Sequence, residues 1–108
     1  MATTPKTRDP KSNRKAIAVD KDAKAANLTR LRRVEGQLRG IQKMIEDDRY
    51  CADVLGQLSA VHEALRAVGR NLLSNHLRHC ARHSFRAGGE QAEAMCDELV
   101  DLFHKNAR

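Results

Sequence analysis

The sequence lacks most of the side chains from which a small domain builds a large core. Only 3% of its 108 residues are aromatic and Trp is absent, so the residues that bury the most area are scarce. Both prolines lie among the first ten residues, at Pro5 and Pro10. Because proline ends or kinks helices, the rest of the chain has no such interruption. We therefore expect long helices whose apolar faces are completed by a second copy of the chain.

Three further features that the sequence lacks or has few of limit the kind of protein it can be. The sequence has no run of about 18 apolar residues and no apolar stretch of signal-peptide length near Met1, so we expect a cytoplasmic protein that does not insert into membranes. Its three cysteines are too few for a disulfide framework, and their histidine neighbours favour metal or redox chemistry. Acidic residues number 14 against 20 Lys and Arg, a net charge of +6 that favours a polyanionic partner.

Residues 1–24 differ in composition from the rest of the chain. They hold both prolines, many lysines and arginines, and almost no apolar periodicity, which predicts a disordered basic arm. The arm is either a solvated tail or a nonspecific contact to nucleic-acid phosphates. Residues 25–108 are the predicted helical domain.

The first predicted helix spans about residues 25–47 and is amphipathic. Its apolar residues recur at steps of three and four, at Leu28, Leu31, Val34, Leu38, Ile41 and Ile45. Its polar face is basic, with Arg30, Arg32, Arg33, Arg39 and Lys43. An array of cations without interleaved aromatic residues suits the phosphates of duplex DNA.

The second predicted helix, residues 50–83, is unusually long and presents two apolar faces. One face suits the first helix, and the other is a seam for a second copy of the chain: Cys51, Leu55, Leu58, His62, Leu65, Gly69, Leu72, His76 and Cys80. A loop is predicted over residues 84–90, because Gly88 and Gly89 can end a helix. A third helix follows over residues 90–105, and Cys96 is expected to fill its buried face.

Three potential metal ligands lie on the seam of the long helix. His76 and Cys80 are one turn apart, whereas Cys51 is roughly 37 Å away at about 1.5 Å per residue. Two copies packed antiparallel would bring Cys51 of one chain beside His76 and Cys80 of the other. Two thiolates and an imidazole suit Cu(I), and Zn(II) remains possible with a fourth ligand. Each residue also has a plain structural explanation, as a small apolar side chain or a hydrogen-bonded histidine.

The remaining histidines of the long helix have simpler explanations. His62 is far from the three potential ligands, so we interpret it as a polar residue that sets the register of the two copies. His79 and His83 are one turn apart and fit a solvated face. A thiol enzyme would need a base beside its cysteine in a cleft, and the only candidate arrangement is better explained as metal ligands, so we expect no catalysis.

Two stretches resemble the CsoR family of copper-sensing repressors, whose relatives respond to nickel or cobalt, formaldehyde or persulfide. They are LTRLRRVEGQLRGIQKMIEDDRYCADVLGQLSAV (residues 28–61) and LLSNHLRHC (residues 72–80). The resemblance implies an all-α fold in which three-helix protomers form an antiparallel dimer, a four-helix bundle, and two dimers form a homotetramer. It also implies a repressor that binds operator DNA without metal, releases it on binding Cu(I), and so controls copper-efflux or resistance genes.

The same resemblance assigns roles to individual residues. It places Cys51, His76 and Cys80 at the Cu(I) ligand positions, and Tyr50 and Glu98 as the pair that couples the histidine ligand to DNA release. It also places Arg30 and Arg70 on the DNA-binding face. Two alternatives stay open: the same scaffold could sense nickel, zinc, a thiol-reactive compound or an aldehyde, or the chain could be a metal-storage or metallochaperone bundle.

Overall fold

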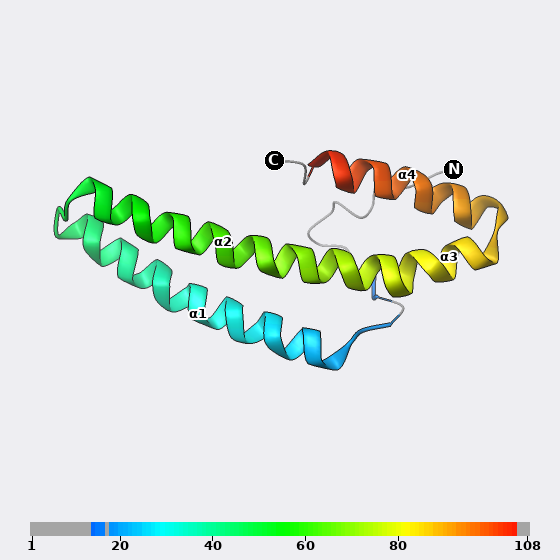
Figure 1. Ribbon diagram of the computed structural model, residues 1–108, viewed down its shortest axis with the longest axis horizontal. Coiled ribbons are helices and arrows are strands. Elements are labelled where there is room, and N and C mark those ends of the chain that lie inside the picture. Colours follow the sequence, from blue (N-terminus) through cyan, green and yellow to red (C-terminus); the bar gives the residue numbers. More distant parts are fainter. Residues whose placement is uncertain (1–13, 17, 106–108) are drawn as a thin grey trace. The chain divides into compact units, whose positions relative to one another are not determined.

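The structure is a computed structural model that describes residues 14–16 and 18–105, and every described element is helical (Figure 1). In chain order the elements are α1 (Lys21–Glu46), α2 (Cys51–Asn75), a π-helical segment (His76–Ala81), α3 (Arg82–Ala87) and α4 (Gly89–Lys105). Helical conformation continues from Cys51 to Ala87, so the described chain contains three helical runs. The predicted all-α class with a long central helix is confirmed.

The start of α1 is set by a side-chain cap at Asp20. The Oδ1 atom of Asp20 accepts hydrogen bonds from the backbone N–H groups of Asp22, at 2.9 Å, and Ala23, at 3.1 Å. These bonds satisfy two N–H groups that the first turn leaves without helical partners. The helix therefore begins four residues before the predicted residue 25, inside the stretch assigned to the arm. Most of that stretch, residues 1–13, lies outside the described part of the chain.

Residues 19–74 form a compact unit, hereafter the hairpin unit, in which α1 and α2 run antiparallel. Its buried core consists of Val34 and Ile41 from α1 and Val61 from α2, with Leu58 packed against it. The turn between the helices contains Asp48, whose φ of 54° lies in the left-handed region. The short turn and the antiparallel pairing make α1 and α2 a helical hairpin.

A polar contact also joins the two helices of the hairpin unit. Asn27, a buried residue on α1, accepts a hydrogen bond from Nδ2 of Asn71 on α2, with 3.1 Å between nitrogen and oxygen. A buried amide without a partner would destabilise the fold by about 1–3 kcal/mol. The pair therefore favours the one register in which Asn27 and Asn71 meet.

Much of the predicted seam on α2 is exposed in the single chain. Leu55 and Leu72 are 62% and 58% exposed. Leu38 and Ile45 of α1 are also exposed, and helical periodicity puts them on the same side of the hairpin as the α2 leucines. This apolar side has the character of a surface that binds another protein chain.

The second compact unit, hereafter the terminal unit, comprises residues 75–105 and the described residues among 14–18. Ala81 packs with Met95 and Leu99 of α4 to form its core. Cys96 is exposed, which contradicts its predicted role as a core residue. The buried residues of α4 are Met95 and Leu99, which lie one turn apart and form a narrow buried face.

The predicted loop over residues 84–90 is wrong in extent. Helix α3 continues to Ala87, and Gly88 alone separates it from α4. Gly88 has φ 72° and ψ −170°, a backbone conformation that essentially only glycine adopts. Ser84, Phe85 and Arg86 contain no helix-breaking residue, so the helix ends only where Gly88 reverses the chain.

Replacing Gly88 by Ala should destabilise the protein by about 1–3 kcal/mol. A Cβ added at this position meets no atom within 4 Å, so the destabilisation would come from backbone strain alone. Gly40, in the middle of α1, also has open space around it, and Gly40→Ala should stabilise by up to about 1 kcal/mol. Urea unfolding of both variants measures these two opposite changes in the free energy of unfolding. Equal stability of Gly88→Ala and the unmodified protein would contradict it.

Candidate metal centre and basic surfaces

The π-helical segment contains two of the three predicted ligands, His76 and Cys80, at its first and fifth positions. Cys80 is buried and His76 is half-buried. Single π-helical turns occur often at functional sites, because the extra residue per turn redirects the side chains that follow. The terminal unit therefore supplies one thiol and one imidazole from a locally distorted stretch of helix.

His76 lies against a carboxylate of α4. Its Nε2 atom is 2.8 Å from Oε2 of Glu98, whose side chain is only 10% exposed. The two groups are within ion-pair distance, but the ring N–H is not aligned as a good hydrogen bond. With Nε2 facing Glu98, Nδ1 is the ring nitrogen left for a metal.

The segment before α1 also contacts this part of the terminal unit. Nη2 of Arg14 lies 3.8 Å from Oε1 of Glu98, and Nδ2 of Asn75 donates a hydrogen bond to the backbone oxygen of Ala18 at 3.0 Å. Glu98 thus faces His76 through one oxygen and Arg14 through the other. This contact could not be predicted from the sequence, since neither residue type nor spacing relates Arg14 to α4.

The third predicted ligand, Cys51, belongs to the hairpin unit and is exposed. Tyr50, predicted to act with Glu98, belongs to the same unit and is 74% exposed. Among the described residues of one chain, no three His, Cys, Asp or Glu side chains are grouped to hold a metal ion. The structure therefore brings His76 and Glu98 together but assembles no complete metal site within one chain.

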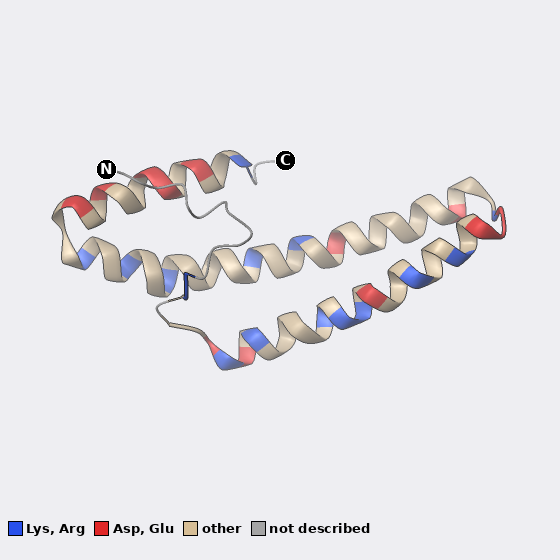
Figure 2. Cartoon of the chain, turned by 180° about the vertical axis from the view of Figure 1, so that it is seen from behind, with Lys and Arg blue, Asp and Glu red and all other residues tan. Residues whose placement is uncertain are grey.

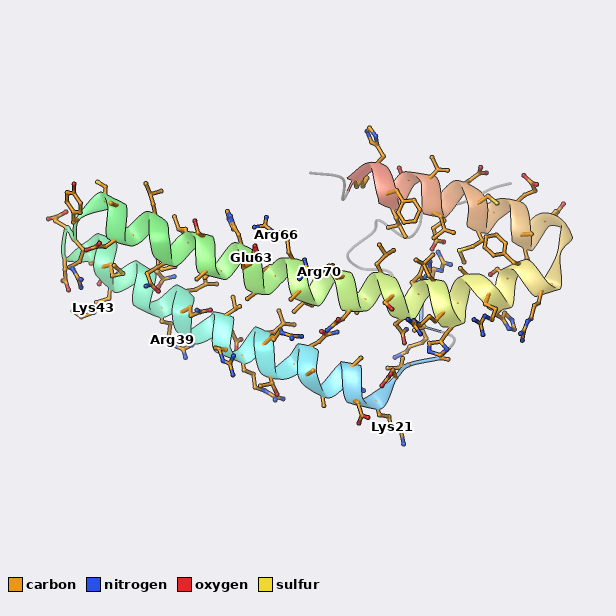
Figure 3. All side chains as sticks on the ribbon, in the orientation of Figure 1. Lys21, Arg39, Lys43, Glu63, Arg66 and Arg70 are labelled. Carbon is orange, nitrogen blue, oxygen red and sulfur yellow. The ribbon has the colours of Figure 1, made fainter. Side chains whose placement is uncertain are left out.

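The predicted DNA-binding arginines occupy different positions on the hairpin unit. Arg32, Arg33 and Arg39 are exposed on α1, and Figure 3 shows Arg39 with Lys21 and Lys43 on the side away from α2. Arg30 is half-buried, and its Nη1 atom is buried without a hydrogen-bond partner.

Arg70 is exposed on α2. It follows the buried Val61 by nine residues, about two and a half turns, so it lies on the side of α2 away from α1. The basic residues of the hairpin unit therefore come from both helices, as the blue segments along α1 and α2 in Figure 2 show.

Comparison with known proteins identifies the family. The family described as metal-sensitive transcriptional repressor matches residues 23–105. The chain belongs to this family. A relative from Bacillus subtilis (strain 168), the copper-sensing transcriptional repressor CsoR, is 51% identical over 77 residues, which cover 70% of this chain and 73% of that protein. The copper-sensing transcriptional repressor RicR of Mycobacterium tuberculosis (strain ATCC 25618 / H37Rv) is 56% identical over 69 residues, 64% of this chain and 72% of that protein.

A solved structure supports the same assignment. The crystal structure of the copper-sensing repressor CsoR with Cu(I) from Geobacillus thermodenitrificans NG80-2 matches with a TM-score of 0.76 and 43% identity, over 85% of this chain and 94% of that chain. The predicted resemblance to metal-sensitive repressors is thereby confirmed. This family is a class of gene regulators. No helix of the described residues is long and apolar enough to cross a membrane.

If a second chain supplies Cys51, two variants of this repressor that bind Cu(I) poorly should restore a site when mixed. Cys51→Ala keeps His76 and Cys80, and His76→Ala keeps Cys51, so their heterodimer should hold one intact site where the unmodified dimer holds two. Refolding the two variants together and titrating Cu(I) anaerobically measures the recovery.

A matched control uses two variants that damage the same half of the site. A mixture of His76→Ala and Cys80→Ala should recover nothing, because neither chain can then supply both residues of the terminal unit. Equal results for the two mixtures, with heterodimers verified by mass spectrometry, would exclude a site shared in this way.

Proposed function

We propose that this protein is a Cu(I)-responsive repressor that binds operator DNA without metal and releases it on binding Cu(I), controlling copper-efflux or resistance genes. Membership of the metal-sensitive repressors supports the class of function. The relatives named as copper sensors, at 51% and 56% identity, support copper as the signal. The ligand set of Cys51, His76 and Cys80 supports it independently, because two thiolates and an imidazole bind soft ions such as Cu(I).

The contact between His76 and Glu98 is the observation that carries the proposal. Histidines that bind metals usually direct their second ring nitrogen to a carboxylate or carbonyl, which fixes the orientation of the ring. Glu98 lies 2.8 Å from Nε2 of His76 and is mostly buried, so it would hold Nδ1 in place for the metal. Cys80, buried in the same segment, would supply a thiolate to the same ion.

A second chain is required to complete this site. The apolar side of the hairpin unit, with Leu55, Leu72, Leu38 and Ile45 exposed, supports an antiparallel dimer in which that side is buried. Such a dimer would place Cys51 of one chain beside His76 and Cys80 of its partner. Two dimers would then form the homotetramer.

The basic residues of the hairpin unit support binding to duplex DNA. Arg32, Arg33 and Arg39 offer exposed cations to phosphates. The Nη1 atom of Arg30 has no hydrogen-bond partner in the described chain, and a phosphate bound at this guanidinium would offer one after a small shift. Because Arg70 lies on the opposite side of the hairpin, we propose that it reaches the DNA from a neighbouring protomer.

Metal binding changes DNA affinity only if the metal favours one arrangement of the chains over the other. Glu98 belongs to α4, and His76 belongs to the long helical run that also carries the dimer seam. If a metal holds the His76 ring, the contact of that ring with Glu98 would also fix the position of α4. Tyr50, next to Cys51, would complete this link from the other chain.

Replacing Glu98 by Ala should therefore weaken the copper-induced release of DNA while leaving the binding of Cu(I) nearly unchanged. The variant should bind Cu(I) within a few-fold of the unmodified protein, because all three ligands remain. Its loss of DNA affinity on metallation should be smaller by about tenfold, within the usual 1–3 kcal/mol of coupling free energies. Anaerobic titration with Cu(I), Ni(II) and Zn(II), while following binding to the DNA upstream of the gene, measures both quantities and ranks the metals.

Asp97→Ala is the matched control, since it removes a neighbouring exposed carboxylate of α4. It should behave as the unmodified protein. Full copper-induced release by Glu98→Ala would show that the coupling runs through another group. If the unmodified protein released DNA with Ni(II) or Zn(II) but not with Cu(I), the metal assignment would be wrong.

Replacing Arg30 and Arg33 by Ala should weaken DNA binding by the metal-free protein. Each lost phosphate contact lowers the slope of log affinity against log salt concentration by about 0.9, so the slope should fall by about 1–2. Arg66→Ala is a suitable control, because Glu63 lies 3.4 Å from that guanidinium and offsets its charge. Fluorescence anisotropy over a salt series measures the slope. Unchanged slope and affinity in the double variant would move the DNA-binding surface elsewhere.

A further inference from the structure

A second basic surface lies on the terminal unit, outside the residues assigned above to metal or DNA. It consists of five exposed residues of the π-helical segment and α3, which we call the basic stripe: Arg78, His79, Arg82, His83 and Arg86. Between His76 and Ala87 the sequence contains these three arginines and no acidic residue. The local charge is therefore strongly positive even with both histidines neutral.

Helical spacing keeps the basic stripe on one side of the helix. The three arginines follow one another at steps of four residues, and each such step in an α-helix turns the side chain by only about 40° at 3.6 residues per turn. The wider π-helical turn at the first step reduces this drift further. The arginines thus form a row along the helix axis.

The basic stripe faces away from the surface that packs on α4. Ala81 is buried against Met95 and Leu99, and at 3.6 residues per turn Arg82 and Arg86 lie about 100° and 140° from it around the helix axis. The acidic residues of the terminal unit are on α4, as Figure 2 shows by its red segments there and blue segments along α3. Arg82 and Arg86 have no ion-pair partner among the described residues. Their charges are therefore not neutralised within the unit.

We propose that the basic stripe is a second DNA contact, which binds phosphates of the duplex beside those held by the hairpin unit. Guanidinium groups bind phosphate oxygens in a bidentate geometry, and contacts to phosphates position a protein on the duplex without reading its sequence. The binding is therefore independent of sequence and sensitive to salt. This inference extends the proposed repressor function and rests on it.

The test compares Arg82→Ala/Arg86→Ala with the unmodified metal-free protein on a random-sequence duplex. The slope of log affinity against log salt concentration should fall by about 1–2, since each phosphate contact contributes about 0.9. Arg82→Lys/Arg86→Lys should keep most of the slope, because the charges remain. Lys105→Ala, which removes an exposed cation of α4, is the control and should change nothing. Circular dichroism and size-exclusion chromatography verify that each variant keeps its fold and assembly.

The possible outcomes distinguish failure of this inference from failure of the proposed function. If the unmodified protein binds DNA and the double alanine variant binds it with the same slope and affinity, the basic stripe is a solvated or protein-binding surface and the inference is wrong. The same conclusion follows if Lys105→Ala loses as much slope as the double variant. If the unmodified protein binds neither the random duplex nor the DNA upstream of its gene, the proposed repressor function fails as well.

Discussion

An unbroken helical run from Cys51 to Ala87 decides what one chain can do. It carries all three predicted metal ligands, but a helix that rises about 1.5 Å per residue cannot fold back to bring its ends together. The described residues of a single chain contain no group of three His, Cys, Asp or Glu side chains that could hold a metal ion. The proposed metal centre would therefore lie at the contact between chains, so that it would exist only in the assembled protein.

The packing within a single chain also favours association with a second chain. Its cores are small: Val34, Ile41 and Val61 in the hairpin unit, and Ala81 with two residues of α4 in the terminal unit. No large side chain among the described residues is fully buried. Exposed leucines on α2 leave apolar area that a neighbouring chain would bury at about 25 cal/mol per Å². Stability and the geometry of the proposed metal centre would then come from one interface.

The sequence predicted the helices well because they depend on local pattern. Apolar residues that recur at steps of three and four predicted α1 and the long helix, and Gly88 indicated where the chain reverses. The predicted ends of the helices were less accurate. Asp20 caps α1 before the apolar pattern of that helix begins, and α3 continues to Ala87 because no residue before Gly88 breaks the helix. The contact of His76 with Glu98 joins residues 22 positions apart across that reversal. Periodicity cannot supply such a pairing, and only the family resemblance indicated it.

Polar contacts between distant segments were the least predictable features. Asn27 lies within an apolar pattern and gave no sign that it would meet Asn71. Arg14 belongs to a segment read as a disordered arm, yet it lies 3.8 Å from the carboxylate that also faces His76. Such contacts depend on where two helices place single atoms, which composition and spacing do not encode. Glu98 nevertheless faces both the proposed ligand His76 and an arginine of the segment before α1. Its position on α4 therefore depends on a packing contact that joins three separate stretches of the chain.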